Sequence, residues 1–160
     1  MSTLNPGDPA PAFSLSDDAG AVHDIASQQG RWTVVYFYPH DDTPGCTTEA
    51  CQFRDLHEDV KVQGATVWGI SPQGPESHRK FREKYELTFP LLCDEDHAVA
   101  EAYGAWGMKN SFGVEKMGLI RTTVLVGPDG KVARVWPQVK ADGHAAEVVA
   151  ALAELKAARA

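Results

Sequence analysis

The segment Trp32–Tyr38 constrains the fold of this chain more strongly than any other stretch. Its sequence, Trp-Thr-Val-Val-Tyr-Phe-Tyr, consists almost entirely of β-branched and aromatic residues. Such a run is typical of a strand that is covered on both faces. We therefore expect residues 32–38 to form a central strand of a sheet, and Pro39 marks the end of the run.

The segments after this strand alternate between helical and extended patterns. Between Thr43 and Val60, apolar residues recur at three- and four-residue spacings, which is typical of an amphipathic helix. Further apolar runs and helical segments follow it along the chain. We expect strands at 65–70 and 88–92, and helices at 76–87, 98–103 and 143–160. Alternating strands and helices indicate the α/β class.

Two turn-rich segments predict β-hairpins. One lies between residues 12–15 and 22–25 near the N-terminus, and the other, Gly127-Pro128-Asp129-Gly130, lies between 119–126 and 131–136. Residues 104–118 show no clear period, so we expect a long loop there, and long loops in compact domains tend to be functional. The simplest assembly is one domain, residues 1–160, with a mixed sheet flanked by helices.

Composition and charge argue against several classes of function. The chain has 160 residues, 43% hydrophobic and 23% charged, as in ordinary globular proteins. Its formal net charge of −7 disfavours binding to nucleic acid or to an anionic membrane. Residues 1–9 lack the pattern of a signal peptide, and no apolar run approaches the ~20 residues of a membrane span. With three cysteines and no export signal, we expect a reducing cytoplasm.

Cys46 has the features of a reactive thiol. Thr43 is a favoured N-cap residue and Pro44 suits the first helical position, so Cys46 falls in the first turn of the predicted helix. Free backbone N–H groups and the helix dipole stabilise a thiolate there. Asp41 and Asp42 oppose a thiolate, so a nearby cation is needed. His40 is close in sequence, but Arg121 is the better candidate because its charge is permanent. A surface histidine and a solvated arginine are nevertheless the commoner states of such residues.

The spacing between Cys46 and Cys51 restricts how the two thiols can react. In an intact helix, residues five apart lie about 140° apart around the axis, with about 7.5 Å of rise. That separation exceeds the ~7 Å limit between the Cα atoms of a disulfide, so pairing requires local unwinding. Alternatives remain open from the residues alone: Cys51 buried in the core, or a metal site with His40 and Asp42. A thioredoxin-type C-x-x-C pair is absent.

The segment Pro39–Cys46 matches the P-x-x-x-T-x-x-C motif of peroxiredoxins. The longer form Thr-Pro-Gly-Cys-Thr-x-Glu-Ala-Cys, which ends at Cys51, resembles the bacterioferritin comigratory protein, or peroxiredoxin Q, subfamily. The resemblance covers almost the whole chain. It includes the segments Gly7–Phe13, Phe89–Leu92 followed by Asp94, Tyr103–Gly104, Trp106–Gly107 and Gly118–Arg121. His40 is a departure, because lysine is frequent at this position in the subfamily.

The resemblance implies a thioredoxin-like fold and assigns roles to four residues. Cys46 would be the peroxidatic cysteine, whose thiolate attacks a hydroperoxide and becomes a sulfenic acid. Thr43 would orient the peroxide through its hydroxyl group. Arg121 would stabilise the thiolate and the charge on the departing oxygen. Pro39 would shield the pocket from water.

The resemblance also implies how the enzyme is recycled. Cys51 would be the resolving cysteine, which forms an intramolecular disulfide with Cys46 that thioredoxin or a similar dithiol reduces. No cofactor or metal is implied, and a monomer is expected. Two other functions remain as alternatives, a thioredoxin-like disulfide reductase and a redox-sensing or metal-binding module. Cys93 has no role in the family pattern and is expected to be a buried cysteine at a strand end.

Overall fold

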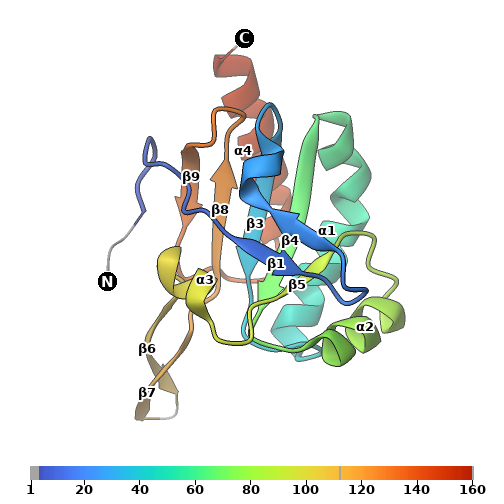
Figure 1. Cartoon of the computed structure of the whole chain (residues 1–160), viewed down its shortest axis with the longest axis vertical. Helices are drawn as coiled ribbons and strands as arrows, with labels where there is room; N and C mark the ends of the chain where they lie inside the picture. The colour runs from blue at the N-terminus through green and yellow to red at the C-terminus, as the bar shows by residue number, and fades with distance from the viewer. Residues whose placement is uncertain (1–3, 112, 160) are drawn as a thin grey trace.

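A computed structural model describes residues 4–111 and 113–159, with residues 110 and 111 described by their backbone alone. A five-stranded mixed sheet forms its centre, in the order β5-β4-β3-β8-β9 (Figure 1). The strands are β3 (Trp32–Phe37), β4 (Ala65–Ser71), β5 (Leu91–Cys93), β8 (Thr122–Val126) and β9 (Val132–Trp136). Strands β3, β4 and β5 are parallel, whereas β8 pairs antiparallel with both β3 and β9. The predicted central strand is confirmed, because β3 lies in the middle and each of its residues is buried.

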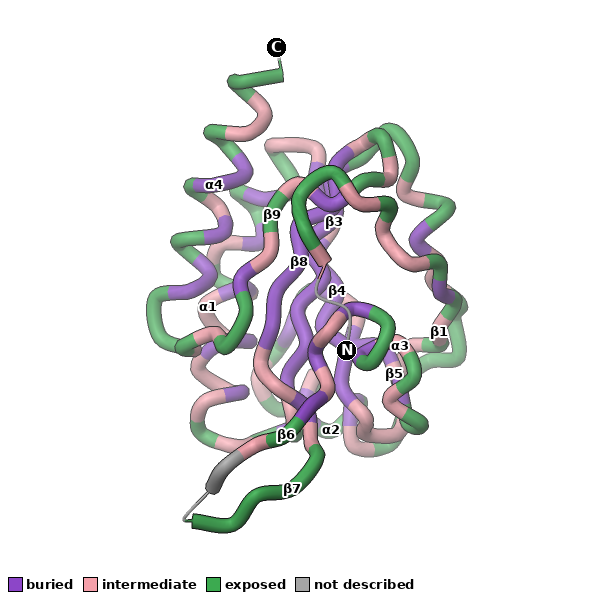
Figure 2. Tube along the Cα trace, turned by 90° about the vertical axis from the view of Figure 1, so that its left-hand side faces the viewer, coloured by how far each residue is buried: buried purple, intermediate pink, exposed green. Residues whose placement is uncertain are grey.

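The side chains of β3 alternate between two separate hydrophobic clusters. Val34 and Tyr36 belong to the first cluster, together with residues of α1 (Pro44–Val62) and α4 (His144–Ala158). Val35 belongs to the second cluster, on the opposite face of the sheet. Because side chains of a strand alternate between its faces, a strand in which every residue is buried must be covered on both sides. The purple core in Figure 2 follows this central sheet.

The second face of the sheet is covered by shorter elements. The predicted N-terminal hairpin is confirmed as β1 (Ser14–Ser16) and β2 (Val22–Asp24), which pair antiparallel and lead into the 3₁₀ helix η1 (Ile25–Gln28). Phe13 precedes the hairpin, and its ring packs edge-on against Trp68 at 5.8 Å and Tyr103 at 5.7 Å. These aromatic contacts join the N-terminal segment to the sheet.

The prediction of a long loop at 104–118 is wrong. Two strands, β6 (Trp106–Ser111) and β7 (Val114–Leu119), form an antiparallel hairpin that extends away from the main sheet (Figures 1 and 2). Most side chains of β7 are exposed, so this strand lacks the apolar alternation that marks a half-buried strand in a sequence. Gly107 also pairs with Gly118 across the ribbon, and glycine is depleted in strands.

Several predicted boundaries shift in the structure. The helix expected at 76–87 is α2 (Pro75–Lys84), the strand expected at 88–92 is β5, and the helix expected at 98–103 is α3 (Ala98–Ala102). The strand expected at 119–126 begins only at Thr122, which leaves Ile120 and Arg121 between β7 and β8. The hairpin around Gly127–Gly130 is confirmed, since the Gly130 N–H donates to the Gly127 carbonyl at 3.0 Å.

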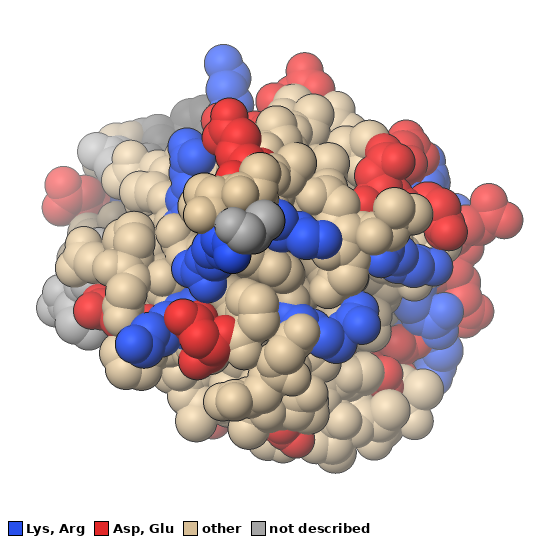
Figure 3. Space-filling model, turned by 90° about the horizontal axis from the view of Figure 1, so that it is seen from above, with Lys and Arg blue, Asp and Glu red and all other residues tan. Residues whose placement is uncertain are grey.

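The net charge of −7 is not spread evenly over the surface. Figure 3 shows a face of the molecule on which lysine and arginine side chains gather near the centre, with acidic side chains around them. Within the described ranges, no helix is both long and apolar enough to cross a membrane.

Candidate active site

The link between β3 and α1 places Cys46 at the end of the central strand. Helix α1 begins at Pro44, as predicted, and Cys46 is its third residue. Thr43 stands at the N-cap position with extended dihedral angles, but its hydroxyl donates to the His40 carbonyl at 3.0 Å rather than capping the helix. The thiol of Cys46 therefore lies where free N–H groups and the helix dipole favour a negative charge.

Arg121 supplies the cation that the sequence required. Its Nη2 lies 3.2 Å from the Cys46 Sγ, and its Nη1 donates to Glu49 Oε1 at 2.6 Å. The Arg121 side chain is only 16% exposed, so the alternative of a solvated arginine is wrong. A Cβ on Gly45 would lie 3.2 Å from the same Nη2, so a glycine there lets the guanidinium rest against the first turn of α1.

Glu49 is the functional residue that the sequence reasoning missed. It is fully buried, and its Oε2 has no hydrogen-bond partner. Burial raises the pKa of Glu49 to about 7, although the Arg121 charge acts to lower it. Burial also acts to lower the pKa of Arg121, but Glu49 and Cys46 outweigh it and raise that pKa. A signal existed, because a carboxylate next to Ala50 on the apolar face of a helix requires a buried partner.

The two aspartates before the helix have partners of their own. Asp41 accepts hydrogen bonds from Tyr38 Oη at 2.6 Å and from Ser77 Oγ at 2.7 Å, and its Oδ2 lies 2.7 Å from His78 Nδ1. Burial acts to raise the pKa of Asp41, but these contacts outweigh it and lower the pKa. Asp42 accepts from Lys84 Nζ at 2.8 Å. Both aspartates therefore have hydrogen-bond partners of their own and do not compete with Cys46 for Arg121.

Pro39 and Arg121 line one pocket of about 390 Å³. Its remaining wall consists of Met108 and Lys109 from β6, with Ile120, Gln138 and Val139. Cys46 lies beneath Arg121 and is 1% exposed. His40, the other candidate cation, is exposed, and its Nδ1 lies 3.2 Å from the Asp41 carbonyl. The structure thus brings Cys46, Arg121 and Pro39 together and leaves His40 outside.

Three free thiols are present in different surroundings. Cys46 is buried, whereas Cys51 and Cys93 are half-buried. Because α1 is continuous from Pro44 to Val62, Cys46 and Cys51 lie on one intact helix. The expectation of a buried Cys93 is corrected, since this residue ends β5 at the edge of a pocket; burial raises the pKa of its thiol to about 11.

A guanidinium held against a cysteine in the first turn of a helix is an arrangement for thiol chemistry with an anionic transition state. The model of the AhpC/TSA family matches residues 6–135, which is most of the chain. The chain therefore belongs to the AhpC/TSA family of peroxiredoxins, and within it to the group named Bcp or peroxiredoxin Q. Peroxiredoxins are thiol-dependent peroxidases, so the protein is an oxidoreductase.

Individual relatives span nearly the whole chain. A putative peroxiredoxin of Coxiella burnetii is 45% identical over 94% of this chain and 99% of its own length. Peroxiredoxin Bcp of Bacillus subtilis is 42% identical over 96% of this chain and 98% of its own. The bacterioferritin comigratory protein of Xanthomonas campestris, solved in work on its alkyl peroxide reduction activity, has a TM-score of 0.88, with 36% identity over 94% of this chain and 98% of its own. These similarities confirm the predicted thioredoxin-like fold.

Proposed function

We propose that Cys46 is the peroxidatic cysteine of this peroxidase. The Cys46 thiolate attacks the terminal oxygen of a hydroperoxide ROOH, so that an S–O bond forms as the O–O bond breaks. The departing RO⁻ takes up a proton and leaves as ROH, and Cys46 becomes a sulfenic acid. The observation that carries this proposal is the 3.2 Å contact between Arg121 Nη2 and the Cys46 Sγ.

Three neighbours have distinct parts in this step. Arg121 stabilises the attacking thiolate and then the negative charge that develops on the departing oxygen, which is the term that usually contributes most to catalysis. Thr43 uses its O–H toward His40, so its oxygen is free to accept a hydrogen bond from the peroxide. Pro39 forms an apolar wall of the pocket and limits the access of water.

We propose that Cys51 resolves the sulfenic acid within the same chain. Its thiol forms a disulfide with Cys46, and thioredoxin or a similar dithiol reduces that bond. The family implies hydroperoxide substrates and a thiol reductant. Hydrogen peroxide and small organic hydroperoxides fit the pocket, because Met108, Ile120 and Val139 provide apolar contacts for an alkyl group.

The decisive experiment is a peroxide-dependent assay with thioredoxin, thioredoxin reductase and NADPH. Wild type should turn over steadily and Cys46→Ser should be inactive. Cys51→Ser should consume one equivalent of peroxide per chain and then stop, because its sulfenic acid has no internal partner. Steady turnover by Cys51→Ser would contradict the resolving role. Reduction of disulfide substrates without peroxide would favour the disulfide reductase instead, and slow reaction with peroxide the redox-sensing module.

A reducing cytoplasm, a monomer and a single domain over residues 1–160 complete the proposal. The cytoplasm supplies the dithiol on which the catalytic cycle depends. The monomer is a prediction from the family resemblance, and sedimentation of the reduced and the oxidised protein checks it. Formation of a stable dimer in both states would contradict it.

A further inference from the structure

The loop 137–143, between β9 and α4, contacts α1 next to Cys51. Gln52 Nε2 donates to Asp142 Oδ1 at 2.7 Å, and the Gly143 N–H donates to Gln52 Oε1 at 2.8 Å. Both ends of one side-chain amide are therefore bonded to the loop. Gln52 directly follows Cys51 in the sequence, so this contact restrains the helix turn that contains the proposed resolving cysteine.

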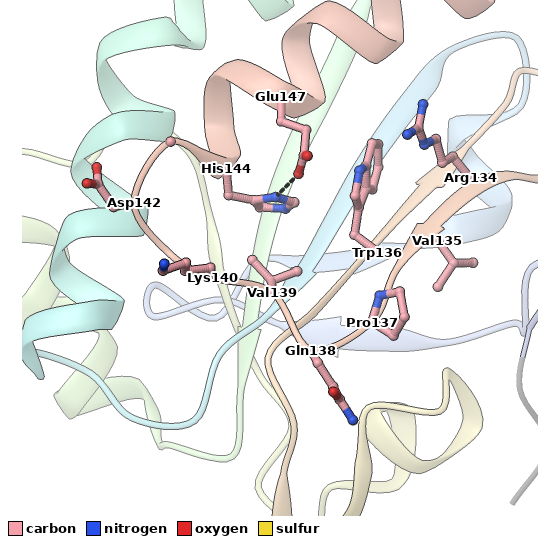
Figure 4. A pocket seen from close by; sticks show the side chains of 11 residues that line it. Arg134, Val135, Trp136, Pro137, Gln138, Val139, Lys140, Asp142, His144 and Glu147 are labelled. Atoms are coloured by element: carbon pink, nitrogen blue, oxygen red, sulfur yellow. Dashed lines mark hydrogen bonds and ion pairs between the residues drawn. The ribbon is translucent and has the colours of Figure 1, made fainter.

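The same loop also approaches the peroxidatic end of the site. The Val139 N–H donates to the Arg121 carbonyl at 2.8 Å, and the Ala141 Cβ lies 4.0 Å from the position of a Cβ on Gly45. Beside the loop, between β9 and α4, is a pocket of about 420 Å³ (Figure 4). Figure 4 shows Asp142 on one side of the pocket and Arg134 on the other. Val139 also packs against the core that contains α1, so the hydrogen bonds of Gln52 are the polar part of the contact between the loop and the helix.

Formation of the Cys46–Cys51 disulfide requires the turn of α1 between the two cysteines to unwind. The Cys51 thiol attacks the sulfur of the Cys46 sulfenic acid: the S–S bond forms, the S–O bond breaks, and the hydroxyl group leaves as water with the thiol proton. About 7.5 Å of helical rise separates the two residues, which is too far for a disulfide. Contacts that favour the wound helix therefore slow this step.

We propose that Gln52 is a positioning residue that acts as a latch on α1 and limits the rate of the Cys46–Cys51 disulfide. This inference rests on the function proposed above for the two cysteines. Gln52 acts through the helix, because its side-chain amide bonds to the 137–143 loop and takes no part in the thiol chemistry. Its two hydrogen bonds hold the turn wound while Cys46 reacts with peroxide, and their release permits the turn to open.

The neighbouring side chains explain why the latch belongs at this position. Ala50 and Phe53 are fully buried, and Phe53 stacks on Tyr36 with the ring centroids 4.7 Å apart. These residues hold the helix in the core on both sides of Gln52. Gln52 itself is only half-buried, so water can replace its partners when the bonds break. Among these three residues, Gln52 is therefore the one whose contacts break with the smallest cost in free energy.

The test separates the two chemical steps in a single turnover with a defined amount of hydrogen peroxide. Rapid quenching and mass spectrometry measure peroxide consumption and disulfide formation for wild type and Gln52→Ala. We expect disulfide formation to accelerate about threefold to tenfold, the effect of losing one or two modest hydrogen bonds. The rate of the peroxide step should stay unchanged. Less Cys46 should become sulfinic acid at high peroxide, because the sulfenic acid has a shorter lifetime.

Matched variants separate the latch from a general loss of helix stability. Asp142→Ala removes one of the two bonds and should accelerate disulfide formation less than Gln52→Ala, whereas Asp142→Asn keeps an oxygen acceptor and should stay near wild type. Glu58→Ala alters an exposed α1 residue that pairs with Lys61 at 3.5 Å, and should leave the disulfide rate unchanged.

Two results would overturn the inference in different ways. If wild type forms the Cys46–Cys51 disulfide and Gln52→Ala forms it no faster, the latch is wrong while the proposed function stands. If wild type forms no such disulfide, the proposed resolving role of Cys51 fails and the latch fails with it.

Discussion

Individual residues show how the site balances opposite charges. Arg121 contacts the Cys46 sulfur on one side and Glu49 on the other, at 3.2 and 2.6 Å. The Cys46 sulfur and the Glu49 carboxylate thus share one guanidinium in a buried space. The second carboxylate oxygen of Glu49 has no partner, so the carboxylate depends on Arg121 for its compensation. This dependence makes Glu49 a positioning residue for the arginine rather than a reactant.

Two substitutions of Glu49 should show whether its hydrogen bond to Arg121 or its charge matters for the rate of peroxide reduction. Glu49→Gln keeps an oxygen that accepts from Arg121, and we expect its rate of peroxide reduction to stay within severalfold of wild type. Glu49→Ala removes the acceptor and leaves Arg121 free to turn away from Cys46. We expect that rate to fall about 10- to 100-fold, in the range seen when one transition-state donor is misplaced. Stopped-flow measurement with hydrogen peroxide checks both, and equal rates for the two variants would contradict the positioning role.

The elements of the fold differ in how far the sequence predicted them. Strand β3 and helix α1 were predicted well, because continuous apolar residues and helical spacing are strong local signals. The β6–β7 ribbon was missed because its strands lie outside the main sheet and most of β7 is exposed. The pairing of Arg121 with Cys46 could not follow from local pattern, because it joins residues 75 positions apart. The need for a cation near Cys46 made Arg121 a candidate, and the family resemblance assigned it that contact, but neither source predicted the role of Glu49.

The loop before α1 is anchored to α2 by a buried polar group. Asp41 and His78 are 7% and 0% exposed, and their side chains approach to 2.7 Å. Replacing His78 by alanine would leave a buried carboxylate without this partner, which typically costs about 3–5 kcal/mol. We expect the free energy of unfolding in urea to fall by about 3 kcal/mol. Ser77→Ala, the matched control in the same group, should cost about 1 kcal/mol. Equal losses for both variants would contradict the anchoring role of His78.

At the scale of the whole molecule, Glu49 should affect how stability depends on pH. The pKa of Glu49 rises from an ordinary 4.5 to about 7 in the folded state. A raised carboxyl pKa means that folding favours the neutral form. The stabilising contribution is therefore complete below about pH 4.5 and is lost as the pH rises to about 7. Asp41, whose pKa is lowered, contributes in the opposite sense and loses its contribution only in acid.

The difference between wild type and Glu49→Gln isolates this effect. Burial lowers the pKa of His57 and of His144, so these two residues make the protein more stable as the pH rises. Both histidines are present in wild type and in Glu49→Gln, so their contribution cancels in the difference. We expect the unfolding free energy of wild type to decline relative to the variant between about pH 4.5 and 7. Urea titrations at a series of pH values measure the difference. A constant difference across this range would show that Glu49 keeps an ordinary pKa.

The alternation of β3 between two cores has a consequence for engineering. The Cys46 helix packs on one core, while the N-terminal hairpin and its aromatic neighbours pack on the other. The proposed unwinding of α1 would therefore alter contacts in the first core and leave those of the second core intact. A fluorescent reporter fused near the exposed turn of the N-terminal hairpin should leave the catalytic cycle undisturbed, whereas the same reporter in the 137–143 loop should respond to each oxidation.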